Sequence, residues 1–154
     1  MAFRIRGLDP APFQPLFDLD DAALAGQGAV RVVADCSPGY PCRIGLTDAP
    51  VGERLILVKY EHQPAETPFR SRYAIYMRRD QLAYDTVDAV PEQLRLRVLS
   101  LRAFDEAGFL HAAEVVDGRA LEGAVERLLG DPQAAYLHAH FAAPGCYAAR
   151  IDRA

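Results

Sequence analysis

The stretch VLSLRAFDEAGFLHAAEVV, residues 98–116, decides the fold class of this chain. Its two largely apolar runs, 98–104 and 109–116, each have the length of a β-strand, and the DEAG sequence at 105–108 has the composition of a hairpin loop. Gly108 suits the left-handed backbone position of such a loop, because glycine has no Cβ to clash there. The stretch therefore predicts two antiparallel neighbouring strands.

The segment after this hairpin predicts the main helix of the fold, over residues 118–129. Leu121 and Val125 begin an apolar stripe at helical spacing along it. Asp117 is a suitable N-terminal cap, and Gly130 is a suitable stop. We expect the stripe to pack on a sheet.

Most of the remaining chain consists of short apolar runs joined by turns. The run RLILVKYEH (54–62) is apolar on both faces, which is typical of a central strand. The other expected elements are strands at 2–7, 30–33, 42–47, 73–77, 135–141 and 146–151, and short helices at 21–26 and 91–97.

Strands outnumber helices, and most neighbours lack the crossover helix that a parallel sheet needs. The sequence therefore predicts one α+β domain over residues 1–154: a mainly antiparallel, twisted or partly closed sheet with the 118–129 helix packed on it and a short N-terminal helix. A chain of 154 residues is long enough to bury a core without metal or disulfides.

Composition excludes several classes of partner. The net charge is −4 and no basic run follows a phosphate backbone, so nucleic acid is not expected. No apolar stretch approaches the ~18 residues of a membrane span, and none follows the N-terminal arginines, so neither a membrane nor a secretory signal is expected. Because no secretory signal is expected, the three cysteines indicate reduced thiols in a cytoplasmic protein. Cys36 and Cys42 flank a two-proline loop that could bring their sulfur atoms together.

The most suggestive chemical feature is His138-Ala-His140. Side chains two positions apart on a strand point to the same face, so both imidazoles line one side of the second hairpin. They could begin a divalent-metal site, with a third ligand from His62, Cys42 or Cys146. They could equally act as a general acid–base pair or lie on a wetted sheet face. The last interpretation is favoured over metal, because two ligands are fewer than zinc sites use.

Cys146 follows a Pro-Gly turn close to these histidines and is a candidate nucleophile, with His140 or His62 as the base. A free cysteine is more often a small buried apolar residue. A two- or four-residue loop puts Cys146 opposite the histidines and Tyr147 beside them, and a bulge would reverse this.

Arginine is the expected anchor for a small anionic ligand. Arg102 interrupts an apolar run, and a half-buried guanidinium needs an acceptor. An internal ion pair with Asp105 or Glu61 is the simpler interpretation. The further candidate ligand-binding residues are Arg43, Arg150, Tyr40 and Tyr147.

Several motifs resemble a bacterial family catalogued as domain of unknown function 1203. They are GYPCR (39–43), YEHQPAETPFR (60–70), LSLRAFDEAG (99–108) and HAHFAAPGCYAARID (138–152). The resemblance runs nearly end to end and implies a one-domain bacterial protein, but it implies no activity.

Three functions remain open from the sequence. The first is a small-ligand pocket, binding or catalytic, lined by histidine, cysteine, arginine and tyrosine and needing no cofactor. The second is a metal-binding domain built on His138 and His140. The third is a structural or interaction domain without catalysis. A homodimer is compatible with all three.

Overall fold

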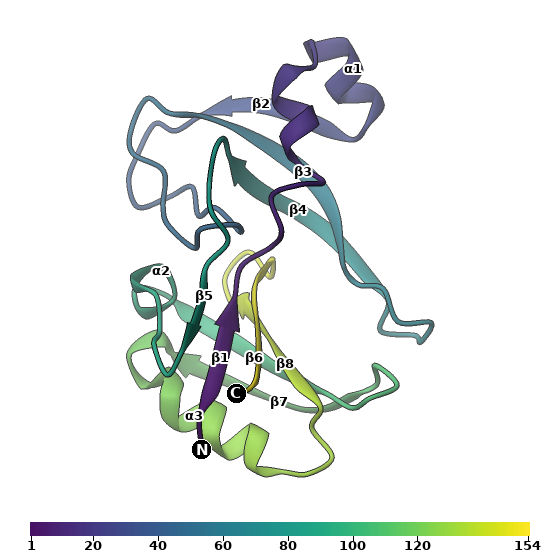
Figure 1. Ribbon diagram of the computed structural model, residues 1–154, viewed down its shortest axis with the longest axis vertical. Helices are drawn as coiled ribbons and strands as arrows, with labels where there is room; N and C mark the ends of the chain where they lie inside the picture. The colour runs from purple at the N-terminus through teal and green to yellow at the C-terminus, as the bar shows by residue number, and fades with distance from the viewer.

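The computed structural model describes residues 1–154 as two antiparallel sheets, the smaller above the larger in Figure 1. The six-stranded sheet has the order β5 (Asp85–Val87), β1 (Phe3–Arg6), β9 (Tyr147–Arg153), β8 (Tyr136–Phe141), β6 (Val98–Phe104) and β7 (Leu110–Asp117). The three-stranded sheet has the order β2 (Ala29–Val33), β3 (Arg54–Gln63) and β4 (Ser71–Arg78). The helices are η1 (Gln14–Asp18), α1 (Asp21–Gly26), α2 (Glu92–Arg95), η2 (Gly118–Ala120) and α3 (Leu121–Gly130). In Figure 1, α1 lies at the top end of the molecule and α3 at the bottom end.

The larger core lies between α3 and the six-stranded sheet. Leu121, Val125 and Leu129 are buried on the sheet-facing side of the helix, as the apolar stripe predicts. The Asp117 carboxylate accepts a hydrogen bond from a backbone N–H of the first turn, which confirms the expected cap. The predicted α+β class, both hairpins and the main helix are therefore confirmed.

A second core packs against the three-stranded sheet, and its buried members include residues of η1, α1, the 42–44 segment and all three strands of that sheet. The Asp20 side chain caps α1 by accepting from the Ala23 N–H at 2.8 Å. Strand β3 is central in this sheet, as its two apolar faces predict. No helix of the structure has both the length and the apolar character needed to cross a membrane.

The strands form two open sheets instead of the single twisted or partly closed sheet expected from the sequence. Two further expectations about single elements also differ from the structure. The strand predicted at 42–47 is wrong: this segment is a buried series of turns with isolated bridges. The backbone of this segment forms hydrogen bonds with three separate parts of the chain. The Arg43 N–H donates to the Tyr76 carbonyl, the Arg43 carbonyl accepts from the Leu8 N–H, and the Ile44 carbonyl accepts from the Tyr84 N–H. The second of these elements is β5, a three-residue edge strand that was not expected and that pairs with β1.

Gly7 lies where the chain leaves the six-stranded sheet and passes the buried 42–46 segment. A Cβ at this position would lie 1.8 Å from the Ile44 carbonyl oxygen, which is backbone and cannot move aside. We expect Gly7→Ala to lower the free energy of unfolding by roughly 3 kcal/mol or more, measured by urea denaturation. Gly26→Ala is the control, because nothing lies within 4 Å of the added Cβ. Equal effects of the two substitutions would contradict the close approach.

Candidate functional site

Three of the four histidines lie together between the two sheets. The His62 ring, from β3, lies 5.0 Å from the His140 ring and 6.3 Å from the His138 ring, measured between centroids. We call these three imidazoles the inter-sheet histidine cluster. Their exposed fractions are 9% for His62, 3% for His138 and 1% for His140. The Tyr147 ring from β9 stacks on His62 with a centroid distance of 5.6 Å.

A shift in the pairing of β8 with β9 brings a tyrosine and an arginine to this cluster. Tyr147 pairs with His140. Arg150 pairs with His138, so Ala148 is an extra residue between the two pairs. A bulge reverses the alternation of side chains along a strand. For that reason Tyr147 and Arg150 both face the histidines, although three positions separate them.

The clustered imidazoles are neutral at pH 7. Burial is the main cause that lowers the pKa values of His138 and His140 to about 3, and burial also lowers the pKa of His62. Three of their nitrogens, Nδ1 of His62, Nδ1 of His138 and Nε2 of His140, are buried without a hydrogen-bond partner. Each such unmade hydrogen bond costs about 1–3 kcal/mol.

Arg102 lies beside the cluster without an acidic partner. It stands on β6 directly opposite His138, and its one hydrogen bond goes to a serine hydroxyl. The two carboxylates that the sequence suggested as partners are engaged elsewhere: Asp105 accepts from a backbone N–H, and Glu61 pairs with Arg70. The Arg102 charge is therefore uncompensated within the chain.

Cys146 and Arg43 form a separate group. The Arg43 side chain is 1% exposed, and its Nη2 donates to the Cys146 sulfur at 3.0 Å. Its Nε donates to the Tyr147 carbonyl at 2.7 Å, and its Nη1 donates to the Pro41 carbonyl. No carboxylate forms an ion pair with Arg43. Burial lowers the pKa of this guanidinium, while the adjacent Cys146 raises it.

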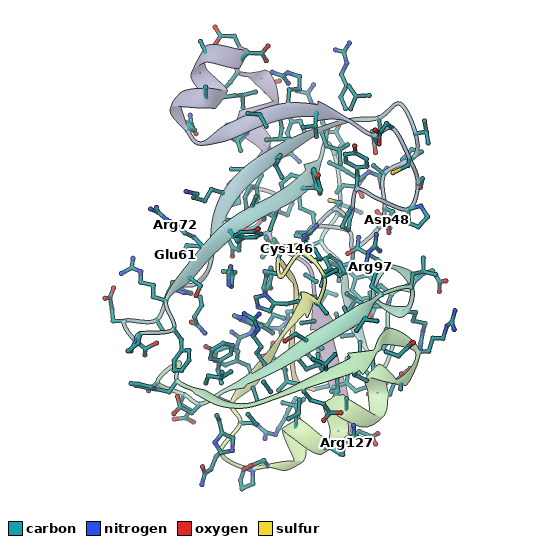
Figure 2. All side chains as sticks on the ribbon, turned by 180° about the vertical axis from the view of Figure 1, so that it is seen from behind. Asp48, Glu61, Arg72, Arg97, Arg127 and Cys146 are labelled. Carbon is teal, nitrogen blue, oxygen red and sulfur yellow. The ribbon has the colours of Figure 1, made fainter.

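A cavity of about 490 Å³ opens beside this pair. Cys146, Arg43, Arg97 and Phe141 are among its lining residues, and most of the remainder are apolar. The guanidinium carbons of Arg43 and Arg97 each lie 4.9 Å from the centroid of the Phe141 ring. Arg97 is neutralised by Asp48, which it binds at 2.6 and 2.9 Å (Figure 2).

The remaining candidate residues are engaged within the chain. Tyr40 donates to Asp35 at 2.9 Å. Arg150 pairs with Asp152 at 2.8 Å, and its guanidinium lies 4.0 Å from the centroid of the Tyr136 ring. Neither residue lines the cavity beside Cys146.

The candidates thus form two groups rather than one. The Cys146 sulfur accepts a hydrogen bond from Arg43, and no hydrogen bond joins Cys146 to a histidine. The backbone links the groups: the Gly145 carbonyl lies 3.0 Å from Nδ1 of His140, and the Tyr147 carbonyl binds Arg43. Residues 145–147 therefore hold one member of each group in place.

Neither a disulfide nor a metal cluster is present among the candidate residues. All three cysteines are free; Cys36 is exposed, and Cys42 and Cys146 are buried. Three or more histidine, cysteine, aspartate or glutamate side chains are nowhere arranged so as to hold a metal ion. A metal site at His138 and His140 stays a prediction.

Sequence reasoning missed Arg97, Asp48 and Phe141 as parts of the cavity. Arg97 and Asp48 are 49 positions apart, and nothing local marks them as partners. Phe141 alternates with the two histidines of its strand and so has the pattern of a core residue. Its position next to the Ala-Ala-Pro-Gly turn was the one available signal, because residues at a strand end leave the core.

Comparison with known proteins gives a family but no function. The family model described as "Protein of unknown function (DUF1203)" matches residues 39–153. No curated protein and no solved structure matches this chain. The matched range contains both groups of candidate residues.

Proposed function

This chain belongs to the DUF1203 family, described as proteins of unknown function, and we propose that it binds a small electrophilic molecule in the Cys146 cavity and reacts with it through the Cys146 thiolate. One observation carries the proposal: a buried guanidinium without any carboxylate partner donates a hydrogen bond to the Cys146 sulfur.

The charge of Arg43 supports the thiolate. A guanidinium stays protonated in proteins, and burying a charge is costly unless an opposite charge lies beside it. Carbonyl oxygens take two of the hydrogen bonds from Arg43, but they carry no net charge. Cys146 is the acidic group that Arg43 hydrogen-bonds, and Cys42 is also near enough to act on its charge. The thiolate is also the reactive form of cysteine, and neighbouring arginine stabilises it.

The cavity walls indicate the kind of molecule that would fit. A volume of about 490 Å³ lies within the range of small-molecule sites. The wall next to the sulfur is mostly apolar and includes Phe141 and Pro144. The thiolate neutralises Arg43, and Asp48 neutralises Arg97, so the lining has little net charge. A compact, largely apolar ligand with one electrophilic carbon matches this lining.

Selective alkylation tests the proposal. At pH 7 the Cys146 sulfur should displace iodide from iodoacetamide about tenfold faster than Cys36, although Cys36 is exposed and Cys146 is 7% exposed. Partial desolvation, together with the hydrogen bond and charge of Asp35, raises the pKa of Cys36 and slows its reaction. Peptide mass spectrometry gives the two rates separately.

The matched control is the same protein unfolded in urea, where all three cysteines should react at similar rates. A native Cys146 that resists iodoacetamide while the unfolded protein reacts would overturn the proposal, because it would show an inert core thiol. Cys146→Ser should retain the fold and lose the fast-reacting site.

A further inference from the structure

The inter-sheet histidine cluster has hydrogen-bonding capacity that the chain itself does not use. Five buried side-chain nitrogen or oxygen atoms lack a hydrogen-bond partner, and three of them belong to this cluster. The three imidazoles come from two different sheets and face one another. The Cys146 group leaves all three nitrogens unused, so the cluster needs a separate explanation.

The tautomer of His140 determines which of its two ring nitrogens can accept a hydrogen bond from a ligand. Its Nδ1 lies 3.0 Å from the Gly145 carbonyl oxygen, which can only accept, so Nδ1 carries the proton. The unpartnered Nε2 is then an acceptor. His138 makes no side-chain hydrogen bond at either ring nitrogen and therefore offers one donor and one acceptor.

The charge around the cluster selects an anion over a metal cation. Arg102 pairs with His138 across β6 and β8. Burial is the main cause that lowers the pKa values of His62, His138 and His140, and the Arg102 charge adds to it at all three rings. Arg150 is compensated by Asp152, whereas Arg102 has no acidic partner. The cluster therefore lies in a positive field with one free guanidinium at its side.

We propose that Arg102 and the inter-sheet histidine cluster bind a small oxoanion that also carries a hydroxyl group. The charged oxygens would bind the Arg102 guanidinium, which matches carboxylate and phosphate geometry. The hydroxyl would donate to Nε2 of His140, and the ring N–H of His138 would donate to an anionic oxygen. Monohydrogen phosphate and hydroxy-carboxylates share this chemistry. The site is distinct from the Cys146 cavity, since no cluster histidine lines that cavity.

Nitrogen NMR of the histidine rings tests the proposal directly. Protein with ¹⁵N-labelled histidine is titrated with inorganic phosphate and, separately, with glycolate, at constant ionic strength. We expect saturable shifts of Nε2 of His140 with at least one of the two anions; the one that binds more tightly identifies the source of the oxoanion. His111, on the exposed strand β7, should not shift and serves as the internal control.

Two variants separate specific binding from general charge effects. Arg102→Gln should weaken binding about tenfold or more, because it removes a charge-assisted hydrogen bond. Arg72→Gln removes one positive charge from an exposed position on the smaller sheet and should leave the affinity unchanged (Figure 2).

Three results would overturn the proposal. They are the absence of a saturable shift with both anions, an equal loss of affinity in the two variants, and stoichiometric shifts of His138 and His140 with Zn²⁺ alone. The NMR experiment observes histidine ring nitrogens and not a thiol. Its result therefore tests the anion site independently of whether Cys146 reacts with iodoacetamide.

Discussion

Acidification from pH 7 to pH 4.5 should remove much of the stability of this protein. His138 and His140 have pKa values of about 3 in the folded protein, against about 6.5 in an unfolded chain. Between these values the unfolded state binds more protons than the folded state, so the free energy of unfolding falls as the pH falls. The stabilisation is fully present above pH 6.5 and is lost progressively down to about pH 3.

The expected slope is roughly 1.4 kcal/mol per pH unit for each histidine, or roughly 5 kcal/mol for the pair at pH 4.5. This is comparable to the whole stability of many domains. Burial is the main cause of both low pKa values. The ionisable groups that add to it are His140, His62, Arg150 and Arg102 for His138, and Arg102, His62 and Arg43 for His140. The Gly145 carbonyl acts in the opposite direction on His140.

Urea denaturation between pH 7 and pH 4.5 measures this effect. His138→Phe and His140→Asn should each reduce the pH slope by roughly 1.4 kcal/mol per unit, because each removes one titrating group. Phenylalanine preserves the aromatic packing against Phe104, and asparagine retains a donor toward Gly145. Val115→Thr, at an exposed position, is the control and should keep the wild-type slope, because it neither adds nor removes a titrating group. Identical slopes in all four proteins would show that the cluster is not neutral in the folded state.

Removal of Arg43 should be the most destabilising single change in the Cys146 group. Arg43→Met deletes three hydrogen bonds and, under the proposed function, would leave a Cys146 thiolate buried without its counter-charge. Breaking a buried ion pair from one side costs about 3–5 kcal/mol. The exposed pair of Arg127 with Glu114 provides the control, since Arg127→Met should change stability by no more than about 1 kcal/mol (Figure 2).

A double-mutant cycle isolates the pair itself. Arg43→Met, Cys146→Ala and the double variant are compared by urea denaturation at pH 7. The double variant should be more stable than the sum of the single effects implies, by about 1 kcal/mol or more, because it buries no unpaired charge. Strict additivity would mean that the sulfur is a neutral thiol, and it would remove the basis for a reactive Cys146.

The sequence by itself determined the local elements of this protein. Both hairpins, the main helix with its Asp117 cap and the long strand at 54–62 follow from short-range patterns: apolar periodicity, turn glycines and side-chain caps. The segment at 42–47 resisted this reasoning because its backbone bonds to three separate parts of the chain. The motifs that carry the family resemblance also contain the candidate residues Arg43, Arg102, both histidines of β8 and Cys146.

Only the tertiary structure decided how these residues are grouped. Alternation along β8 placed His138 and His140 on one face, but their contact with His62 depends on the stacking of a second sheet. The extra residue Ala148 turns Arg150 to the same face, and a bulge leaves no clear mark in sequence. The pairing of Cys146 with Arg43 spans 103 positions. Contacts of this kind arise from the packing of distant segments, which local patterns do not encode.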